Sequence, residues 1–152
     1  MRHRLRFRFP LLIFTLLLLG ACASPLPKPV DSPWFRTAAG GFMMDLADDR
    51  LTVRDLYYHL VLEPVKPLTH PLYLHTRFPD PASPGREILV DQRVAAGATQ
   101  VVIRSPRLKR IERGATYRVR VEIFADAGHN RQLGVHEQAV YAGADVDDKV
   151  HL

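Results

Sequence analysis

The fold class is decided by one stretch of the sequence, Thr116-Tyr117-Arg118-Val119-Arg120-Val121-Glu122-Ile123-Phe124. Apolar and charged side chains alternate through it, with the apolar ones at positions 117, 119, 121 and 123. Successive side chains of a β-strand point to opposite faces of the sheet. The alternation therefore predicts a strand with one face on a hydrophobic core and the other face in water.

Six further segments have strand character and lie on both sides of this stretch. They span residues 42–46, 53–62, 72–78, 87–90, 100–104 and 133–141. The last one follows a turn at residues 126–130, which predicts a hairpin with the Thr116–Phe124 strand. Because turn signals recur between short strands and no amphipathic helix is present, the sequence predicts an all-β fold. We expect an antiparallel β-sandwich of six or seven strands, Ig-like or transthyretin-like.

The approach to this strand contains Ile111, then a turn with Gly114, then Tyr117. That order resembles the corner leading into strand F of fibronectin type III and related Ig-like domains. The resemblance implies that Tyr117 is a tyrosine corner, with its hydroxyl bonded back to the preceding connection. The alternative is an ordinary tyrosine on the core face of the strand, and both interpretations place the ring inside.

The N-terminal segment has the layout of an export signal. Residues 1–9 carry four arginines and no acid, and residues 11–19 are apolar except for Thr15. This apolar run is too short to span a bilayer, which takes about 20 residues. The next residues, Leu19-Gly20-Ala21-Cys22, resemble the lipobox of bacterial lipoproteins.

The lipobox resemblance implies that diacylglycerol is joined to the Cys22 thiol and that cleavage occurs before this residue. It also implies that the new amino group receives a fatty acid such as palmitate. The alternative is an ordinary secreted protein whose cysteine lies near the cut site by chance. Ala23 stands where inner-membrane lipoproteins carry aspartate, so we expect anchoring in the outer membrane, on its periplasmic face.

These signals divide the chain into four parts. We expect a lipoprotein signal peptide at 1–21, a lipidated cysteine with a proline-rich tether at 22–33, a β-sandwich domain at 34–144 and an acidic tail at 145–152. Four prolines in residues 23–33 favour an extended tether, which at about 3.1 Å per residue spans roughly 30 Å. Loss of the signal lowers Lys+Arg from 21 to 17 against 16 acids, so we expect no nucleic-acid partner.

Motifs for catalysis are absent from the sequence, and we expect the protein not to be an enzyme. It has no Gly-x-Ser-x-Gly and no glycine-rich phosphate loop. The histidines between the signal and the C-terminal tail are His59, His70, His75, His129 and His136. Since a metal site needs three or four ligands brought together and their spacing shows no such cluster, we expect no metal and no cofactor.

Charge placement is the most unusual feature of the mature chain. Between residues 104 and 120, seven cations accompany the single acid Glu112. A possible docking patch comprises Arg107, Lys109, Arg110 and Arg113. One interpretation is a solvated loop, and the other is an electrostatic surface for an acidic partner or anionic lipid headgroups.

These observations favour a non-catalytic envelope lipoprotein whose β-sandwich binds or scaffolds another envelope protein. The general plan resembles small sandwich lipoproteins that act as pilotins or assembly factors for secretion systems. The alternatives are binding of a small ligand or envelope polymer, and an immunity lipoprotein. A pocket lined by Trp34, Tyr57, Tyr58 and Tyr73 would favour the ligand, and a flat arginine patch would favour the protein partner.

Overall fold

The computed structural model describes residues 32–46 and 53–143. The predictions for the signal peptide, Cys22, most of the tether and the acidic tail concern residues outside this part. Within the described ranges, no helix is long and apolar enough to cross a membrane.

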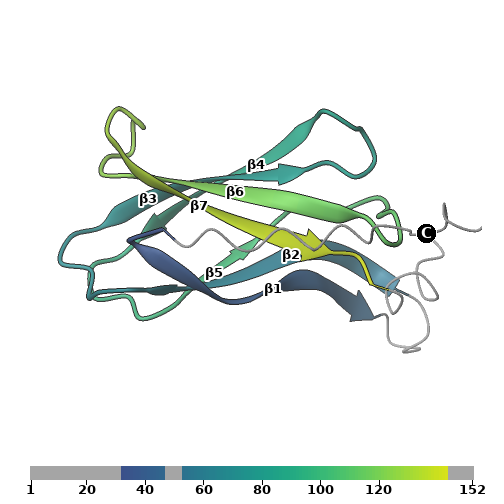
Figure 1. Cartoon of the computed structure of the whole chain (residues 1–152), viewed down its shortest axis with the longest axis horizontal. Helices are drawn as coiled ribbons and strands as arrows, with labels where there is room; N and C mark the ends of the chain where they lie inside the picture. The colour runs from purple at the N-terminus through teal and green to yellow at the C-terminus, as the bar shows by residue number, and fades with distance from the viewer. Residues whose placement is uncertain (1–31, 47–52, 144–152) are drawn as a thin grey trace, which may run out of the picture.

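Two antiparallel sheets pack face to face and enclose one core (Figure 1). The three-stranded sheet has the order β1-β2-β5, with β1 at Phe35–Leu46, β2 at Val53–Pro64 and β5 at Val101–Arg104. The four-stranded sheet has the order β4-β3-β6-β7. Its strands are β3 at Leu72–Pro79, β4 at Glu87–Val94, β6 at Thr116–Phe124 and β7 at Gln132–Tyr141. The predicted all-β sandwich is confirmed.

The connections follow an Ig-like pattern with one change. In the constant-type immunoglobulin fold, the fourth strand lies in the sheet of the first, second and fifth strands. Here β4 pairs with β3 in the other sheet instead, from Leu72 opposite Val94 to Pro79 opposite Glu87. The predicted hairpin is confirmed, because β6 and β7 pair along their whole length.

Two strands exceed their predicted ranges by more than two residues. Strand β1 begins at Phe35 rather than at residue 42, and β4 continues to Val94 rather than ending at residue 90. The extra part of β1 contains small residues of weak strand propensity, and its pairing with β2 shifts register between Thr37 and Ala39. Pairing with a long apolar neighbour therefore overrides local propensity, as is common in sheets.

The core lies between the sheets and is rich in aromatic rings. Tyr58 is 1% exposed and stacks on Phe78 of the facing sheet, with 5.1 Å between ring centroids, while Phe42, its partner on β1, lies 4.7 Å from it. Burying such rings removes a large apolar area from water, which is the main favourable contribution to folding. The core joins both sheets into a single unit.

Tyr117 makes the hydrogen bond of a tyrosine corner. The backbone N–H of Glu112 donates to its hydroxyl oxygen over 2.9 Å, five residues upstream. Between them Gly114 has a φ of 76°, a conformation that glycine adopts without steric cost. The ring is partly buried and lies edge-on to Phe42 at 5.7 Å. The structure therefore confirms the corner prediction.

Removal of this hydroxyl should lower stability while leaving the ring in place. We expect Tyr117→Phe to decrease the free energy of unfolding by about 1 kcal/mol, because the N–H of Glu112 loses its acceptor. Urea denaturation measures the change. Tyr141→Phe is the matched control, since that ring is 51% exposed and should show no effect. A neutral Tyr117→Phe would show that the corner bond does not stabilise the domain.

Candidate functional site

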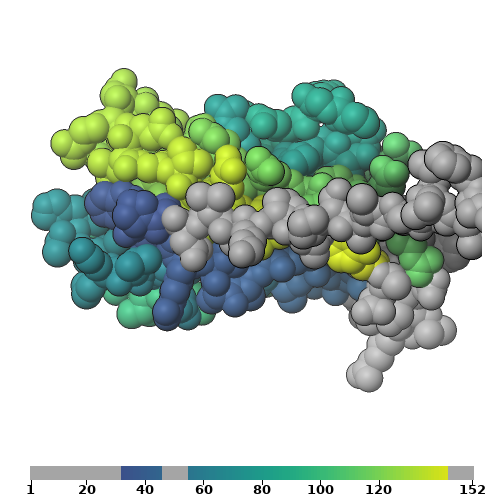
Figure 2. All heavy atoms as spheres, viewed as in Figure 1, coloured from purple at the N-terminus to yellow at the C-terminus, as the bar shows by residue number. Residues whose placement is uncertain are grey.

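The sandwich has two distinct ends (Figure 1). We call one the tether end, because the chain enters there at residues 32–34, beside the 65–71 and 125–131 connections. The far end carries the 80–86 and 105–115 connections and the last residues of β7. Figure 2 shows the dark-blue start of the described chain beside the yellow-green β6–β7 turn, at the opposite end from the teal β3–β4 connection.

The start of the domain is fixed by a buried histidine on β7. His136 is fully buried, and its Nδ1 accepts the backbone N–H of Ser32 at 3.4 Å. Its Nε2 lies 2.7 Å from the Thr37 hydroxyl, so Nε2 carries the proton and donates it to that oxygen. Trp34 adds a bond from its indole N–H to the carbonyl of Leu133 at 3.3 Å. The direction in which the chain enters is thereby set at the tether end.

The predicted basic patch lies at the far end, in the connection between β5 and β6. We call residues 105–115 the basic connection, and its four cations Arg107, Lys109, Arg110 and Arg113 are all exposed. Leu108 is buried at 1% exposure between them, and its N–H donates to the carbonyl of Leu56 over 2.7 Å. The backbone is therefore attached to β2 while the charged side chains project outward.

The cations of the basic connection differ in how they are paired. Arg107 lies 3.5 Å from Asp55, and Arg113 also has an interaction of its own. Lys109 and Arg110 make no ion pair or hydrogen bond with the described residues. These two side chains are therefore the ones available to an acidic partner.

The neighbouring arginines of β6 are neutralised within their own sheet. Arg120 lies 2.9 Å from Glu137 and 3.2 Å from Glu122, and Arg118 lies 3.8 Å from Glu137. Burial raises the pKa of Glu122, but the hydrogen bond from Arg120 and the charge of Arg77 lower it more, so the net shift is downward. The unpaired positive charge of Lys109 and Arg110 therefore does not continue along β6.

The tyrosines proposed for a ligand pocket do not share one. Tyr58 is in the core, Tyr57 lies under Arg104 at 5.1 Å, and Tyr73 lies on the outer face of β3. Burial and a hydrogen bond to Asp45 raise the pKa of Tyr57. Tyr57 and Tyr58 are separated because adjacent side chains on β2 point to opposite faces of the sheet.

A different cavity opens at the tether end. It measures about 650 Å³ and is walled by Trp34, Leu68, Leu72 and Leu133, with Lys66 among its lining residues. Of the four predicted pocket residues, Trp34 alone contributes to it. Its apolar walls suit an apolar group.

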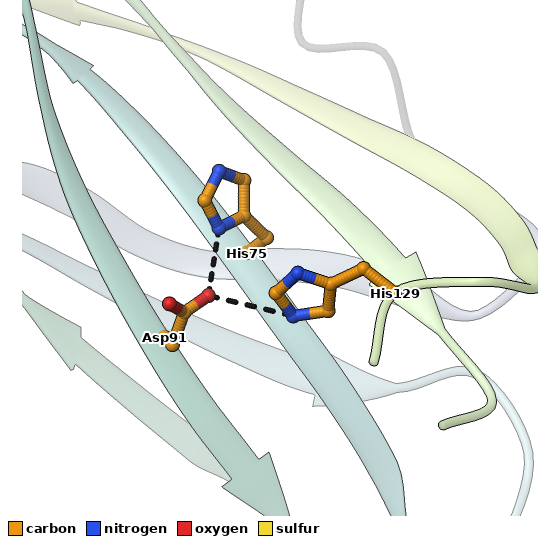
Figure 3. Close-up of side chains that lie close together, drawn as sticks. All are labelled: His75, Asp91 and His129. Carbon is orange, nitrogen blue, oxygen red and sulfur yellow. Dashed lines mark hydrogen bonds and ion pairs between the residues drawn. The ribbon is translucent and has the colours of Figure 1, made fainter. Parts of the chain in front are cut away.

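The histidines lie closer together than their sequence spacing suggests. His75 and His129 both reach Asp91 on the outer face of the four-stranded sheet, where dashed lines mark the two contacts (Figure 3). Sequence reasoning missed this group because Asp91 is opposite His75 only in the observed β3–β4 register. The sequence signal that could have revealed the group is a histidine and an acid, His75 and Asp91, that both point outward and face each other across the β3–β4 hairpin.

Comparison with protein families, with curated proteins and with solved structures gave no match to this chain. A function for the protein therefore depends on its own geometry. Within residues 32–46 and 53–143, three features are available: an exposed basic connection, an apolar cavity at the tether end, and the His75–Asp91–His129 group.

Proposed function

We propose that this protein is a non-catalytic envelope lipoprotein, anchored in the outer membrane through Cys22, that binds or scaffolds another envelope protein. Its docking surface is the basic connection, with Arg107, Lys109, Arg110 and Arg113. One observation carries the proposal: this connection lies at the opposite end of the sandwich from the point where the tether joins. By general plan, such a protein is comparable to pilotins or assembly factors of secretion systems.

The separation of the two ends favours a protein partner over lipid headgroups of the anchoring membrane. Strand β6 has nine residues, which at about 3.3 Å per residue gives roughly 30 Å between the ends. The Debye length at physiological salt is about 8 Å, so charges at the far end do not act on a bilayer below the tether end. They act on whatever approaches the domain from the other side.

The chemistry of the basic connection suits an acidic protein surface. A guanidinium presents a planar set of donors that pairs with carboxylates through two parallel bonds. Exposed ion pairs contribute only about 0–1 kcal/mol each, so they select and orient the partner more than they hold it. Apolar contact at the same end can supply affinity, since Tyr141 is 51% exposed and Met43 is 39% exposed.

Charge reversal in the basic connection should abolish partner capture without affecting folding. We expect the double variant Lys109→Glu, Arg110→Glu to keep its stability within about 0.5 kcal/mol, because both side chains are exposed. Capture of the partner from a membrane extract should fall sharply, and wild-type capture should weaken as salt rises. Both are measured by quantitative mass spectrometry of the captured proteins.

The matched control reverses two cations at the tether end, Lys66→Glu and Arg131→Glu, which changes the net charge by the same amount. It should capture the partner as the wild type does. If the wild type and both double variants capture the partner equally, the basic connection is a solvated loop and not a docking surface. Equal loss in both variants would show that overall charge, rather than this surface, governs capture.

The cavity at the tether end supports a second candidate function, the binding of a small apolar ligand. Its volume of about 650 Å³ lies within the range of ligand pockets, about 300–1,000 Å³. Lys66 and Arg131 also line it and could hold an anionic group. If binding of the captured molecule is lost in the Lys66→Glu, Arg131→Glu variant and kept in the Lys109→Glu, Arg110→Glu variant, ligand binding in this cavity is favoured over docking at the far end.

A further inference from the structure

We propose that His75, Asp91 and His129 form a binding site for a divalent transition-metal cation, with Zn²⁺ as the reference ion. The site is separate from both surfaces considered above, and its existence does not depend on the proposed docking function.

The ligand atoms already lie close to the spacing that such an ion requires. Nδ1 of His75 is 2.7 Å from Oδ1 of Asp91, and Nε2 of His129 is 3.5 Å from the same oxygen. All three lie within 4.8 Å of one another. Tetrahedral zinc with bonds of about 2.0–2.1 Å separates its ligands by roughly 3.3 Å. Small side-chain rotations therefore suffice to place an ion between them.

The fold brings these side chains together from three separate segments (Figure 3). His75 on β3 and Asp91 on β4 are register partners, so both project from the outer face of the sheet. His129 lies in the turn between β6 and β7, on the other side of β3 from β4. The side chains of His75 and His129 are 14% and 32% exposed, so an ion would be partly shielded yet reachable from solvent.

The turn presents His129 in a fixed orientation. Oδ1 of Asp126 accepts the backbone N–H groups of Gly128 and Asn130, both at 3.1 Å, and Oδ2 accepts that of Arg131 at 2.9 Å. The backbone N–H of His129 itself donates to the carbonyl of Asp126 over 3.2 Å. These bonds within the turn fix the backbone that carries the imidazole.

The conformation and packing of His129 are unusual for a surface side chain. It has a φ of 56°, and in the described ranges it is the one residue other than glycine with a positive φ. Its ring packs against Phe124 at 4.6 Å and against His75 at 5.1 Å between centroids. A left-handed residue held by its surroundings is a feature that clusters at functional sites.

The donor set indicates the class of ion. Two imidazoles and one carboxylate match the three-ligand zinc sites that keep a fourth position open. Mg²⁺ and Ca²⁺ prefer oxygen ligands, whereas Zn²⁺ and Cu²⁺ accept imidazole nitrogen. With two neutral imidazoles and one carboxylate, bound Zn²⁺ retains one positive charge. Its open position would therefore take water or an anionic group.

Zinc titration of the full chain tests the proposal. The protein is purified in detergent without a polyhistidine tag and titrated with ZnCl₂ at pH 7.5 by calorimetry. We expect one Zn²⁺ per chain, and no competition from a large excess of Mg²⁺ or Ca²⁺. Asp91→Asn and His129→Gly should each weaken binding by at least about tenfold, because even changes outside the ligand shell cost 10–100-fold. His70→Ala, an exposed histidine outside the group, should bind as the wild type does.

These variants separate metal binding from folding. Asn is close in size to Asp on an exposed edge position, and glycine adopts the φ of His129 without strain, so both proteins should fold cooperatively in EDTA, where each melting temperature is the reference for that protein's own zinc shift. Zinc should then raise the melting temperature of the wild type and of His70→Ala only. No binding by the wild type, or equal binding by all four proteins, would overturn the site. Equal affinity for Ca²⁺ would overturn the assignment of the ion.

Discussion

Tyr58→Ala is expected to lower the free energy of unfolding by about 3–5 kcal/mol, the range for truncating a large buried aromatic. The ring is 1% exposed and packs against both Phe42 and Phe78. Its hydroxyl donates to the carbonyl of Pro79 at 3.1 Å, and burial raises its pKa. Truncation leaves a cavity where both sheets meet, so the whole domain loses stability.

Urea denaturation followed by circular dichroism measures this change. Tyr58→Phe is the matched control, because it retains the ring and loses only the bond to Pro79, which should cost about 1 kcal/mol. A cost below about 1 kcal/mol for Tyr58→Ala would contradict the packing of the two sheets around this ring.

Cys22→Ser is expected to remove all fatty-acid label from the protein and to leave a precursor longer by the signal peptide. Serine offers no thiol for diacylglycerol, and the lipobox resemblance implies that cleavage follows this modification. Lipid matters for anchoring because each buried CH₂ contributes about 0.8 kcal/mol, and stable anchoring takes more than one chain.

Metabolic labelling with a fatty-acid analogue, followed by mass measurement of the intact protein, gives both results at once. Ser24→Ala is the control, since it lies beyond the lipobox and should be labelled and cleaved as the wild type is. Wild-type protein without label would refute the anchor and, with it, the inference that the far end faces away from the membrane.

Much of the fold could be predicted because the strongest strand has a strict period of two. Strand β6 has the predicted bounds, since four apolar side chains at alternating positions leave one choice of buried face. The beginning of β1 could not be predicted in the same way. Its small residues at 38–41 carry no alternation, and they form a strand because β2 provides hydrogen-bond partners. The last residues of β4 are paired with β3 in the same manner.

The candidate sites could be predicted only in part, because they depend on register and pairing. The position of the basic connection followed from the sequence, but the pairing of Arg107 with Asp55 and of Arg120 with Glu137 did not. To predict the His75–Asp91–His129 group, one would have needed the register of β3 against β4 and the left-handed conformation of His129. Hydrophobic periodicity specifies neither.

Photo-crosslinking in living cells tests the central claim most directly. A photoreactive residue replaces Arg110 at the far end, and in a matched protein it replaces Lys66 at the tether end. We predict a covalent adduct with one envelope protein from position 110, none from position 66, and loss of the adduct when Lys109→Glu is added. An adduct that forms from position 66 and not from position 110 would contradict the account.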